Sequence, residues 1–586
     1  MSLTMNLTSR LRRAVAPAAL LTALAMPAVA QDFERIAPKE PPANPPAGSL
    51  PAPPVPAPTP GGGTVLLPAL KGVVFLPDAG QLRRDGVASA GIDSGRVDVL
   101  DRDDFRALLA PFLGQPVTLD RLNEISRLAV VYFREHDHPL VDIVIPEQDV
   151  SAGTVQILAL EFRAGTVRTE GNRWFSDGLL LSQVRTRPGD RILASDLLAD
   201  VNWLNRNPFR RVDLVYERSE QAGRSDIGLR VADRLPLRAF GGYENTGTAS
   251  TERGRSFVGV NWGNAFWLDH QLSYQFTASP GAWRDGLKGL ERARSASHSG
   301  SYFAPLPWRH TLTVFGSYSE TRPDLEDSFT QLGRSSQASV RYGVPLPALW
   351  GLEHEVQGGF DWKRTNSDLA FGGTSVARSA ADVAQWMLGY SAVRPDAWGS
   401  TAAGLSLFVS PGGFDDKNSS TAFQLQRSGA EARYHYGRLT LERLTRLPEG
   451  LSWSVRVQGQ MADRPLLATE QLGFGGGTSV RGYDERVVNG DQGVLISNEL
   501  RSPEFGVLGQ EDAAQVLAFW DYGAAWNRNA GNGVPRSARL SGAGVGLRYA
   551  LAPYLSLRFD YGWALTKAPG EDKRGTRPHI GLTAAF

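Results

Sequence analysis

The most constraining feature of this chain is the alternation of apolar and polar side chains over residues 237–586. Successive side chains of a β-strand point to opposite faces, so a period of two indicates strands with one apolar and one polar face. The clearest run covers residues 554–565. Its apolar positions are Leu555, Leu557, Phe559, Tyr561, Trp563 and Leu565, and the positions between them are Ser556, Arg558, Asp560, Gly562 and Ala564.

Two further properties distinguish this β-region from a soluble sandwich. Its apolar face is rich in Tyr, Trp and Phe, which suits the aromatic girdles of a membrane barrel. Its strands run to about ten residues, longer than the usual 5–6 of soluble sheets. At about 10–11 residues per strand plus turns, the region holds about 16 antiparallel strands around a polar lumen. The sequence therefore predicts a transmembrane β-barrel over residues 236–586.

The chain ends on an aromatic residue within an alternating run. Ile580, Leu582 and Ala584 lead to Phe586. A chain that ends inside a strand suits a barrel whose last strand pairs with its first. We predict that Phe586 closes the final strand and acts as a C-terminal assembly signal.

The N-terminus has the pattern of a secretory signal peptide. Arg10, Arg12 and Arg13 precede the apolar residues 14–26, and residues 28–30 form a small-x-small cleavage site. The apolar segment is shorter than the ~20 residues of a spanning helix, which disfavours a membrane anchor. We predict a signal peptide over residues 1–30 and a Pro-rich linker over residues 31–69.

Between the linker and the barrel, the sequence predicts two units that have the same order of strands and helices. Residues 70–162 read as a strand, two helices and two strands, with Thr118 as the cap of the second helix. Residues 163–235 repeat this order, with Ser176 and Ser195 as predicted helix caps. A repeated supersecondary order indicates two successive α+β modules.

Composition and missing motifs exclude several classes of function. Lys plus Arg number 62 and Asp plus Glu 61, so the chain lacks the basic excess of a nucleic-acid binder. Cysteine is absent, which removes disulfides, zinc–thiolate sites and thiol nucleophiles. The sequence contains neither His-Glu-x-x-His nor Gly-x-Ser-x-Gly, and no Lys-Ser/Thr follows the Gly-rich residues 473–477. We therefore expect no enzyme and no cofactor.

A metal site is considered only at two histidines of the first module. His136 and His138 flank Asp137 after the second predicted helix. Because no further ligands converge on them in the sequence, a turn with exposed imidazoles is expected instead of a metal site.

Four motifs, in this order, resemble those of one family of secretion proteins. Pro146, Gln148, Asp149 and Gly153 resemble the first POTRA-type module of two-partner secretion transporters, and Asn207, Pro208 and Phe209 resemble the second. Val480, Arg481, Gly482 and Tyr483 resemble the family's loop-six motif, and Phe519, Asp521 and Gly523 its barrel-wall motif. From about residue 70 onward, the chain is similar to TpsB transporters such as ShlB, FhaC and HecB, which belong to the Omp85 superfamily.

The resemblance implies a location, partners and an activity. The POTRA modules would lie in the periplasm of a Gram-negative bacterium. The barrel would lie in outer-membrane lipid, inserted there by the barrel assembly machinery. The implied activity is recognition of one large secreted protein, of adhesin or haemolysin type, by the modules and its translocation through the barrel. No nucleic acid or cofactor is implied.

Arg481 and Asp521 form a candidate pair on physical grounds as well. Arg481 lies in a Gly-rich stretch, residues 473–482, that can fold back without backbone strain. Trp520 is expected on the lipid side of its strand. Because consecutive side chains of a strand point to opposite faces, Asp521 is predicted to point into the lumen. A guanidinium can hold a carboxylate through two hydrogen bonds, so we expect the loop tip to be pinned inside the barrel. The alternative is that Arg481 is a solvated loop charge.

Other functions fit parts of the pattern. A barrel assembly factor of the same superfamily typically has a larger set of modules, and a passive porin needs none. A surface enzyme on a barrel anchor would need catalytic motifs. Members of the family often carry an N-terminal helix that plugs the pore, but the Pro-rich residues 31–68 do not predict one.

Overall fold

The computed structural model describes residues 36–44, 50, 64–283, 293–325, 329–349, 351–371, 374–509, 512–530 and 535–586. The chain divides into two compact units, one of residues 44–235 and one of residues 236–586 together with the segment that ends at Ala43. The predicted signal peptide and most of the predicted linker lie outside the described residues. No helix in the described part of the chain is both long and apolar enough to cross a membrane.

The first half of the smaller unit is a four-stranded sheet that packs against two helices. Its strand order is β3-β2-β6-β5, and β1 and β4 form a separate pair. The elements are β1 (Val65–Leu67), β2 (Gly72–Leu76), β3 (Gly91–Asp93), α2 (Asp103–Leu109), β4 (Val117–Thr118), α3 (Leu119–Glu135), β5 (Val141–Val144) and β6 (Thr154–Glu161).

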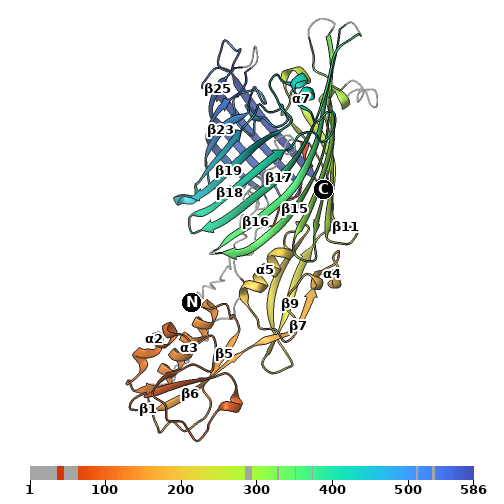
Figure 1. The fold of residues 1–586 in the computed structure, drawn as a ribbon. Helices are drawn as coiled ribbons and strands as arrows, with labels where there is room; N and C mark the ends of the chain where they lie inside the picture. The colour runs from red at the N-terminus through yellow and green to blue at the C-terminus, as the bar shows by residue number, and fades with distance from the viewer. Residues whose placement is uncertain are drawn as a thin grey trace, which may run out of the picture. The chain divides into compact units, whose positions relative to one another are not determined.

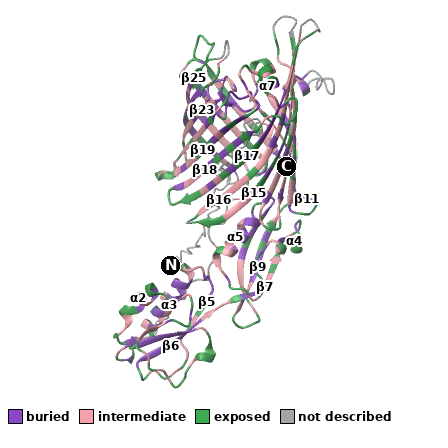
Figure 2. Cartoon of the chain, in the orientation of Figure 1, coloured by how far each residue is buried: buried purple, intermediate pink, exposed green. Residues whose placement is uncertain are grey.

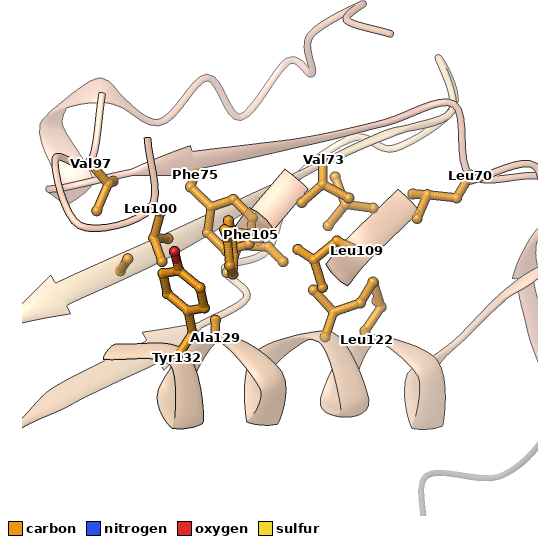
Figure 3. Close-up of a cluster of buried hydrophobic side chains, with 14 of the residues drawn as sticks. Leu70, Val73, Phe75, Val97, Leu100, Phe105, Leu109, Leu122, Ala129 and Tyr132 are labelled. Atoms are coloured by element: carbon orange, nitrogen blue, oxygen red, sulfur yellow. The ribbon is translucent and has the colours of Figure 1, made fainter. Parts of the chain in front are cut away.

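Aromatic side chains from three elements form the centre of this half. Phe105 of α2 packs between Phe75 of β2 and Tyr132 of α3, at ring-centroid distances of 5.3 and 4.8 Å (Figure 3). Leu122 and Ala129 point from α3 into the same cluster, because residues at helical spacing share one face. Burial of this face fixes the helices on the sheet.

The second half of the smaller unit is a three-stranded sheet of order β7-β9-β8 with two helices. Strand β7 pairs parallel with β9, and β8 pairs antiparallel with it. The elements are β7 (Arg163–Glu170), α4 (Asp177–Ser182), α5 (Ala194–Leu204), β8 (Arg210–Arg218) and β9 (Arg224–Asp233). They enclose a separate apolar core that includes Leu180, Leu197 and Val212.

Two of the three predicted helix caps are confirmed. The hydroxyls of Thr118 and Ser176 accept first-turn N–H groups of α3 and α4. The prediction for Ser195 is wrong, because α5 begins at Ala194 and the N–H of Ser195 donates to the Asp137 carboxylate at 2.7 Å. Asp137 adopts φ 74 in the turn after α3, and its carboxylate joins the two halves of this unit.

Sixteen strands of the larger unit form a closed barrel, as predicted, in which β27 pairs with β10. Figure 1 shows the barrel as a ribbon. Every pairing in the barrel is antiparallel. The strands are β10 (Leu237–Glu244), β11 (Arg255–Ala265), β12 (His270–Ala278), β13 (Ser295–Pro305), β14 (Thr311–Thr321), β15 (Phe329–Leu349), β16 (Leu352–Phe371), β17 (Thr374–Asp396), β18 (Gly399–Ser410), β19 (Tyr434–Arg446), β20 (Ser452–Ala462), β23 (Gln492–Arg501), β24 (Asp512–Trp526), β25 (Ser537–Leu551), β26 (Leu555–Ala564) and β27 (Thr576–Ala585).

The barrel strands are apolar on the outside and polar on the inside. Buried and exposed stretches alternate along the barrel strands (Figure 2). In β24 the exposed positions Val516 and Trp520 alternate with the buried positions Phe519 and Asp521. An apolar exterior around a polar interior is what a barrel in lipid requires. The buried polar side chains include Gln275, Ser299, Gln337, Asp361, Lys363, Gln385, Arg438, Gln460, Asp560 and His579.

A charge on the outer face is expected to destabilise the barrel more than the same charge on the inner face. Leu439 is 52% exposed on β19, and Thr440 occupies the opposite face. Leu439→Arg should lower the free energy of unfolding by about 2–4 kcal/mol near the bilayer midplane, and Thr440→Arg, as the matched control, by much less. Urea unfolding in phosphatidylcholine vesicles measures both. Equal losses would contradict the assignment of faces.

Candidate functional site

The connection between β20 and β23, residues 463–491, folds back against the inner wall of the barrel. We call it loop six. Within it, β21 (Leu472–Phe474) and β22 (Val488–Gly490) pair with each other. Phe474, Val480 and Tyr483 of the loop are buried in one cluster with wall residues such as Leu495 of β23. The Gly-rich stretch thus lies inside the barrel, as the sequence predicts.

Arg481 is the centre of the contact between loop six and the wall. Its Nε and Nη2 donate to the two carboxylate oxygens of Asp521, at 2.7 and 2.9 Å, and its backbone N–H donates to the same group at 3.1 Å. Its Nη1 donates to Glu499 at 2.6 Å. The guanidinium lies 3.5 Å from the ring centroid of Phe519. The structure therefore brings Arg481 and Asp521 together in the bidentate geometry that the residues predict.

Three carboxylates from three strands face this guanidinium. Glu499 of β23, Asp521 of β24 and Asp560 of β26 lie 2.6, 2.7 and 3.5 Å from nitrogen atoms of Arg481. Arg548 also donates to Asp560, at 2.8 Å. Because a buried carboxylate needs a cation or several donors, removal of Arg481 would leave Asp521 poorly compensated.

The other residues of the loop motif also contact the wall. Val480 is fully buried next to Gly523 of β24. Gly482 has φ 100, and its N–H donates to His579 of β27 at 3.1 Å. The hydroxyl of Tyr483 donates to the backbone carbonyl of Ser541 at 2.7 Å. Each residue of the motif therefore takes part in docking the loop.

Glycines on adjacent strands let the loop backbone lie directly on the wall. A Cβ at Gly542 of β25 would lie 1.9 Å from the carbonyl oxygen of Arg481. A Cβ at Gly562 of β26 would lie 2.5 Å from the amide nitrogen of Gly482. We call Gly523, Gly542 and Gly562 the glycine wall. A side chain at Gly542 or Gly562 would displace the loop tip.

A second set of contacts holds the base of loop six on other strands. Glu470 is fully buried and accepts hydrogen bonds from Lys363 of β16 and Tyr436 of β19, both at 2.7 Å. On the other leg of the loop, Asp491 accepts a hydrogen bond from Arg427 at 2.9 Å. Arg427 follows helix α7 (Ser420–Gln426) in the connection between β18 and β19. Loop six is thus fixed at its tip and at its base.

Several of these groups cannot be identified as partners of loop six from the sequence. The alternation of residues 554–565 predicts Asp560 on the polar face of its strand, and the same alternation directs Glu499 into the lumen. The alternation does not predict which residue of loop six these two carboxylates contact. Glu470 and Asp491 lie in a loop, where no period fixes the direction of a side chain. No signal in the sequence identifies them.

The first POTRA motif builds the turn before β6. The side-chain amide of Gln148 donates to the carbonyl of Gln156 at 2.7 Å and accepts the N–H of Gln156 at 2.7 Å. The carbonyl of Pro146 also accepts from Gln148, at 3.2 Å. Asp149 accepts the N–H of Ser151, a hydrogen bond that lowers the pKa of this carboxyl. Gly153 has φ 90, which favours glycine at this turn.

The motif of Asn207, Pro208 and Phe209, which resembles that of a second POTRA module, closes the turn before β8. The side-chain oxygen of Asn207 accepts the N–H of Phe209 at 3.0 Å, and Phe209 is buried in the core of this half. The carbonyl of Pro208 accepts from Arg234 at 3.2 Å. Both motifs therefore shape turns inside their own modules.

The expectation of exposed imidazoles is wrong for His138. Its ring is buried, and Nδ1 lies 2.6 Å from Glu161. Burial opposes ionisation of Glu161, but the hydrogen bond and charge of His138 lower its pKa overall. The described residues contain no group of three or more His, Asp or Glu side chains that could hold a metal ion.

The two ends of the larger unit lie near each other on β10. Phe586 exchanges two backbone hydrogen bonds with Ala239, at 2.9 and 3.0 Å. The described residues 36–43 of the predicted linker contact the inner face of the same region, where the carbonyl of Lys39 accepts from Asn261 at 3.2 Å. The Lys39 ammonium pairs with Glu244 at 2.7 Å.

Two family models match the chain. One, described as haemolysin secretion/activation protein ShlB/FhaC/HecB, matches residues 223–549, more than half of the chain. The other, described as a POTRA domain of ShlB type, matches residues 89–161.

Similar proteins and structures agree with these matches. The heme/hemopexin transporter protein HuxB of Haemophilus influenzae is 22% identical over 487 residues, 77% of this chain and 80% of the relative. The outer membrane transporter CdiB of Dickeya dadantii is 22% identical over 491 residues, 80% of this chain and 81% of the relative. Among solved structures, CdiB from Escherichia coli has a TM-score of 0.69 at 16% identity and covers 91% of this chain and 94% of its own. At this identity the structural likeness concerns the fold.

A methyl group in the glycine wall is expected to displace the tip of loop six. Because the chain has no cysteine, Ser479→Cys adds a single thiol at a position that is 9% exposed when the loop is docked. Gly542→Ala in this background should raise the rate of maleimide labelling severalfold, since the new Cβ would overlap Arg481. Gly358→Ala, where nothing lies within 4 Å of the added carbon, is the matched control. Equal rates in both variants would contradict tight docking.

Proposed function

We propose a mechanism by which this chain, which belongs to the haemolysin secretion/activation protein family ShlB/FhaC/HecB, exports its partner protein. The chain is an outer-membrane transporter of a secreted protein, with POTRA modules in the periplasm. The observation that carries the mechanism is the bidentate Arg481–Asp521 pair, which holds loop six in the lumen.

The proposed organisation follows the chain. Residues 1–30 are a signal peptide, residues 31–69 a linker, residues 70–162 and 163–235 two POTRA domains, and residues 236–586 the barrel. Phe586 serves as the signal for the barrel assembly machinery, and lipid surrounds the apolar exterior. No catalytic step, cofactor or nucleic acid takes part.

Capture of the partner occurs by strand addition to a POTRA sheet. The outer strands are β3 and β5 in the first sheet and β7 and β8 in the second. The start of β8 already bonds to a side chain, since Val212 and Asn205 exchange two hydrogen bonds at 2.7 and 2.9 Å. Further along β8, the backbone N–H and C=O groups of every second residue point away from β9, towards the edge of the sheet that has no neighbouring strand. Main-chain hydrogen bonds at such an edge need little side-chain specificity.

Passage of the extended partner requires movement of loop six. Breaking a buried ion pair costs about 3–5 kcal/mol, and water in the lumen reduces this cost. The Arg481–Asp521 pair therefore acts as a latch that opens when the partner occupies the lumen. Folding of the partner outside the cell gives the movement its direction.

Deletion of the gene tests the function. Culture medium and the outer-membrane protein profile are compared with those of the parent strain. We expect the loss of one large protein from the medium and an unchanged membrane profile. A broad loss of barrels from the membrane, with no secreted protein missing, would instead identify an assembly factor.

Opening of the latch is tested at Arg481. Arg481→Ala should reduce secretion of the partner at least tenfold, while the amount of folded barrel, measured by heat-modifiable gel mobility, changes little. Arg443→Ala, which removes an ion pair with Asp396 at the other end of the barrel, is the matched control and should secrete normally. Normal secretion by Arg481→Ala would contradict the latch.

A further inference from the structure

Strand β17 extends beyond its neighbour β18 at one end of the barrel. The last pair between them is Trp386↔Val409, so residues 374–385 have no partner in β18. On the other side β17 pairs with β16 up to Phe371↔Thr374. The two strands have 23 and 20 residues, whereas about 9–11 suffice to span a bilayer. Strand β15 accompanies β16 up to Phe329↔Phe371, so the surplus of β17 extends beyond β18 together with β15 and β16 (Figure 1).

This extension lies on the outer side of the membrane. The chain passes from the periplasmic modules directly into β10, so β10 starts at the periplasmic end. Successive barrel strands run in alternate directions. The turn between β16 and β17 therefore lies at the extracellular end, next to the opening of the lumen.

Part of the free edge of β17 is already occupied. The N–H of Asp382 donates to the carbonyl of Lys417 at 3.1 Å, and the carbonyl of Asp382 accepts from the side chain of Asn418 at 2.7 Å. The connection that contains α7 thus covers β17 from Asp382 onward. These bonds also show that the backbone groups of Asp382 point away from β16.

The same parity directs the backbone groups of Arg378 and Ala380 away from β16. Alternate residues of a strand present their N–H and C=O to the same side. Among the residues that the structure describes, none pairs with these groups from the β18 side. A β-bulge at Val376 interrupts the register with β16, so the regular part of the open edge begins at Ala377.

The sequence of this edge does little to prevent strand pairing. Exposed edges are usually protected by charged residues, proline or burial. Residues 374–381 contain no proline, one charged residue (Arg378) and otherwise only Thr, Ser, Val and Ala. Small side chains allow another backbone to approach closely. An extended polypeptide is the ligand that satisfies a row of free N–H and C=O groups.

We propose that residues 377–381 of β17 accept a strand of the secreted partner as it leaves the barrel. The inference rests on the proposed function, which supplies an extended chain at this opening. Pairing gives the emerging segment a template with strand geometry, so that folding starts at the cell surface. It also opposes backward sliding of the partner through the lumen.

A photo-cross-linking amino acid at Ala380, in the full chain in intact secreting cells, tests the contact. Ser367 of β16 is the matched control, because it lies one pair from Ala380 on the central strand, with partners on both sides. We expect an adduct with the protein that disappears from the medium on gene deletion, from position 380 and not from position 367. Equal adducts at both positions, no adduct, or an adduct of two copies of this chain would overturn the proposal.

A second pair of variants tests whether pairing with β17 speeds folding of the partner at the cell surface. Ala380→Pro removes an outward N–H that β16 does not use, and Ala380→Val keeps it. Loss of one edge hydrogen bond should slow the appearance of protease-resistant partner by about threefold to tenfold in the proline variant only. Identical rates would overturn the proposal. If gene deletion removes no protein from the medium, the proposed function itself fails; if it does and these tests are negative, only the edge contact fails.

Discussion

The rest of the structure depends on the closure of the barrel by β10 and β27. In lipid every backbone N–H and C=O must be paired within the protein, and only a closed sheet leaves no edge. The closing pair runs from Phe240↔Ala585 to Glu244↔Gly581, and Phe586 extends it at Ala239. Closure turns one face of every strand towards lipid and the other towards the lumen. The polar interior, in which loop six docks, follows from this division.

Loop six makes use of that polar interior. Carboxylates on the lumen face of β23, β24 and β26 need a cation, and Arg481 provides one from the loop. The glycine wall supplies the space that this approach requires. The base of the loop is held by Glu470 and Asp491 on other partners, so the tip is able to leave the wall while the base stays in place.

Whether the sequence predicts the direction of a side chain depends on whether the residue lies in a regular strand or helix. A period of two fixes the direction of a side chain in a strand, which is why Asp521 could be placed in the lumen and the strand number estimated. Outside regular elements no such rule applies. Ser195 lost its predicted role because Asp137, distant in sequence, reaches the start of α5. His138 is buried because the chain folds it onto Glu161, which a local reading of the turn does not show.

The glycine wall has a consequence for the kinetics of the loop. Contacts between two backbones at van der Waals distance act over a very short range, and the bidentate geometry of Arg481 is equally demanding. A shift of the tip by a fraction of an ångström therefore weakens both at once. We therefore expect no stable half-open position of the loop near the wall. The loop should act as a two-state element, in which partial occupancy of the lumen changes how often the loop is released and not how far it is displaced.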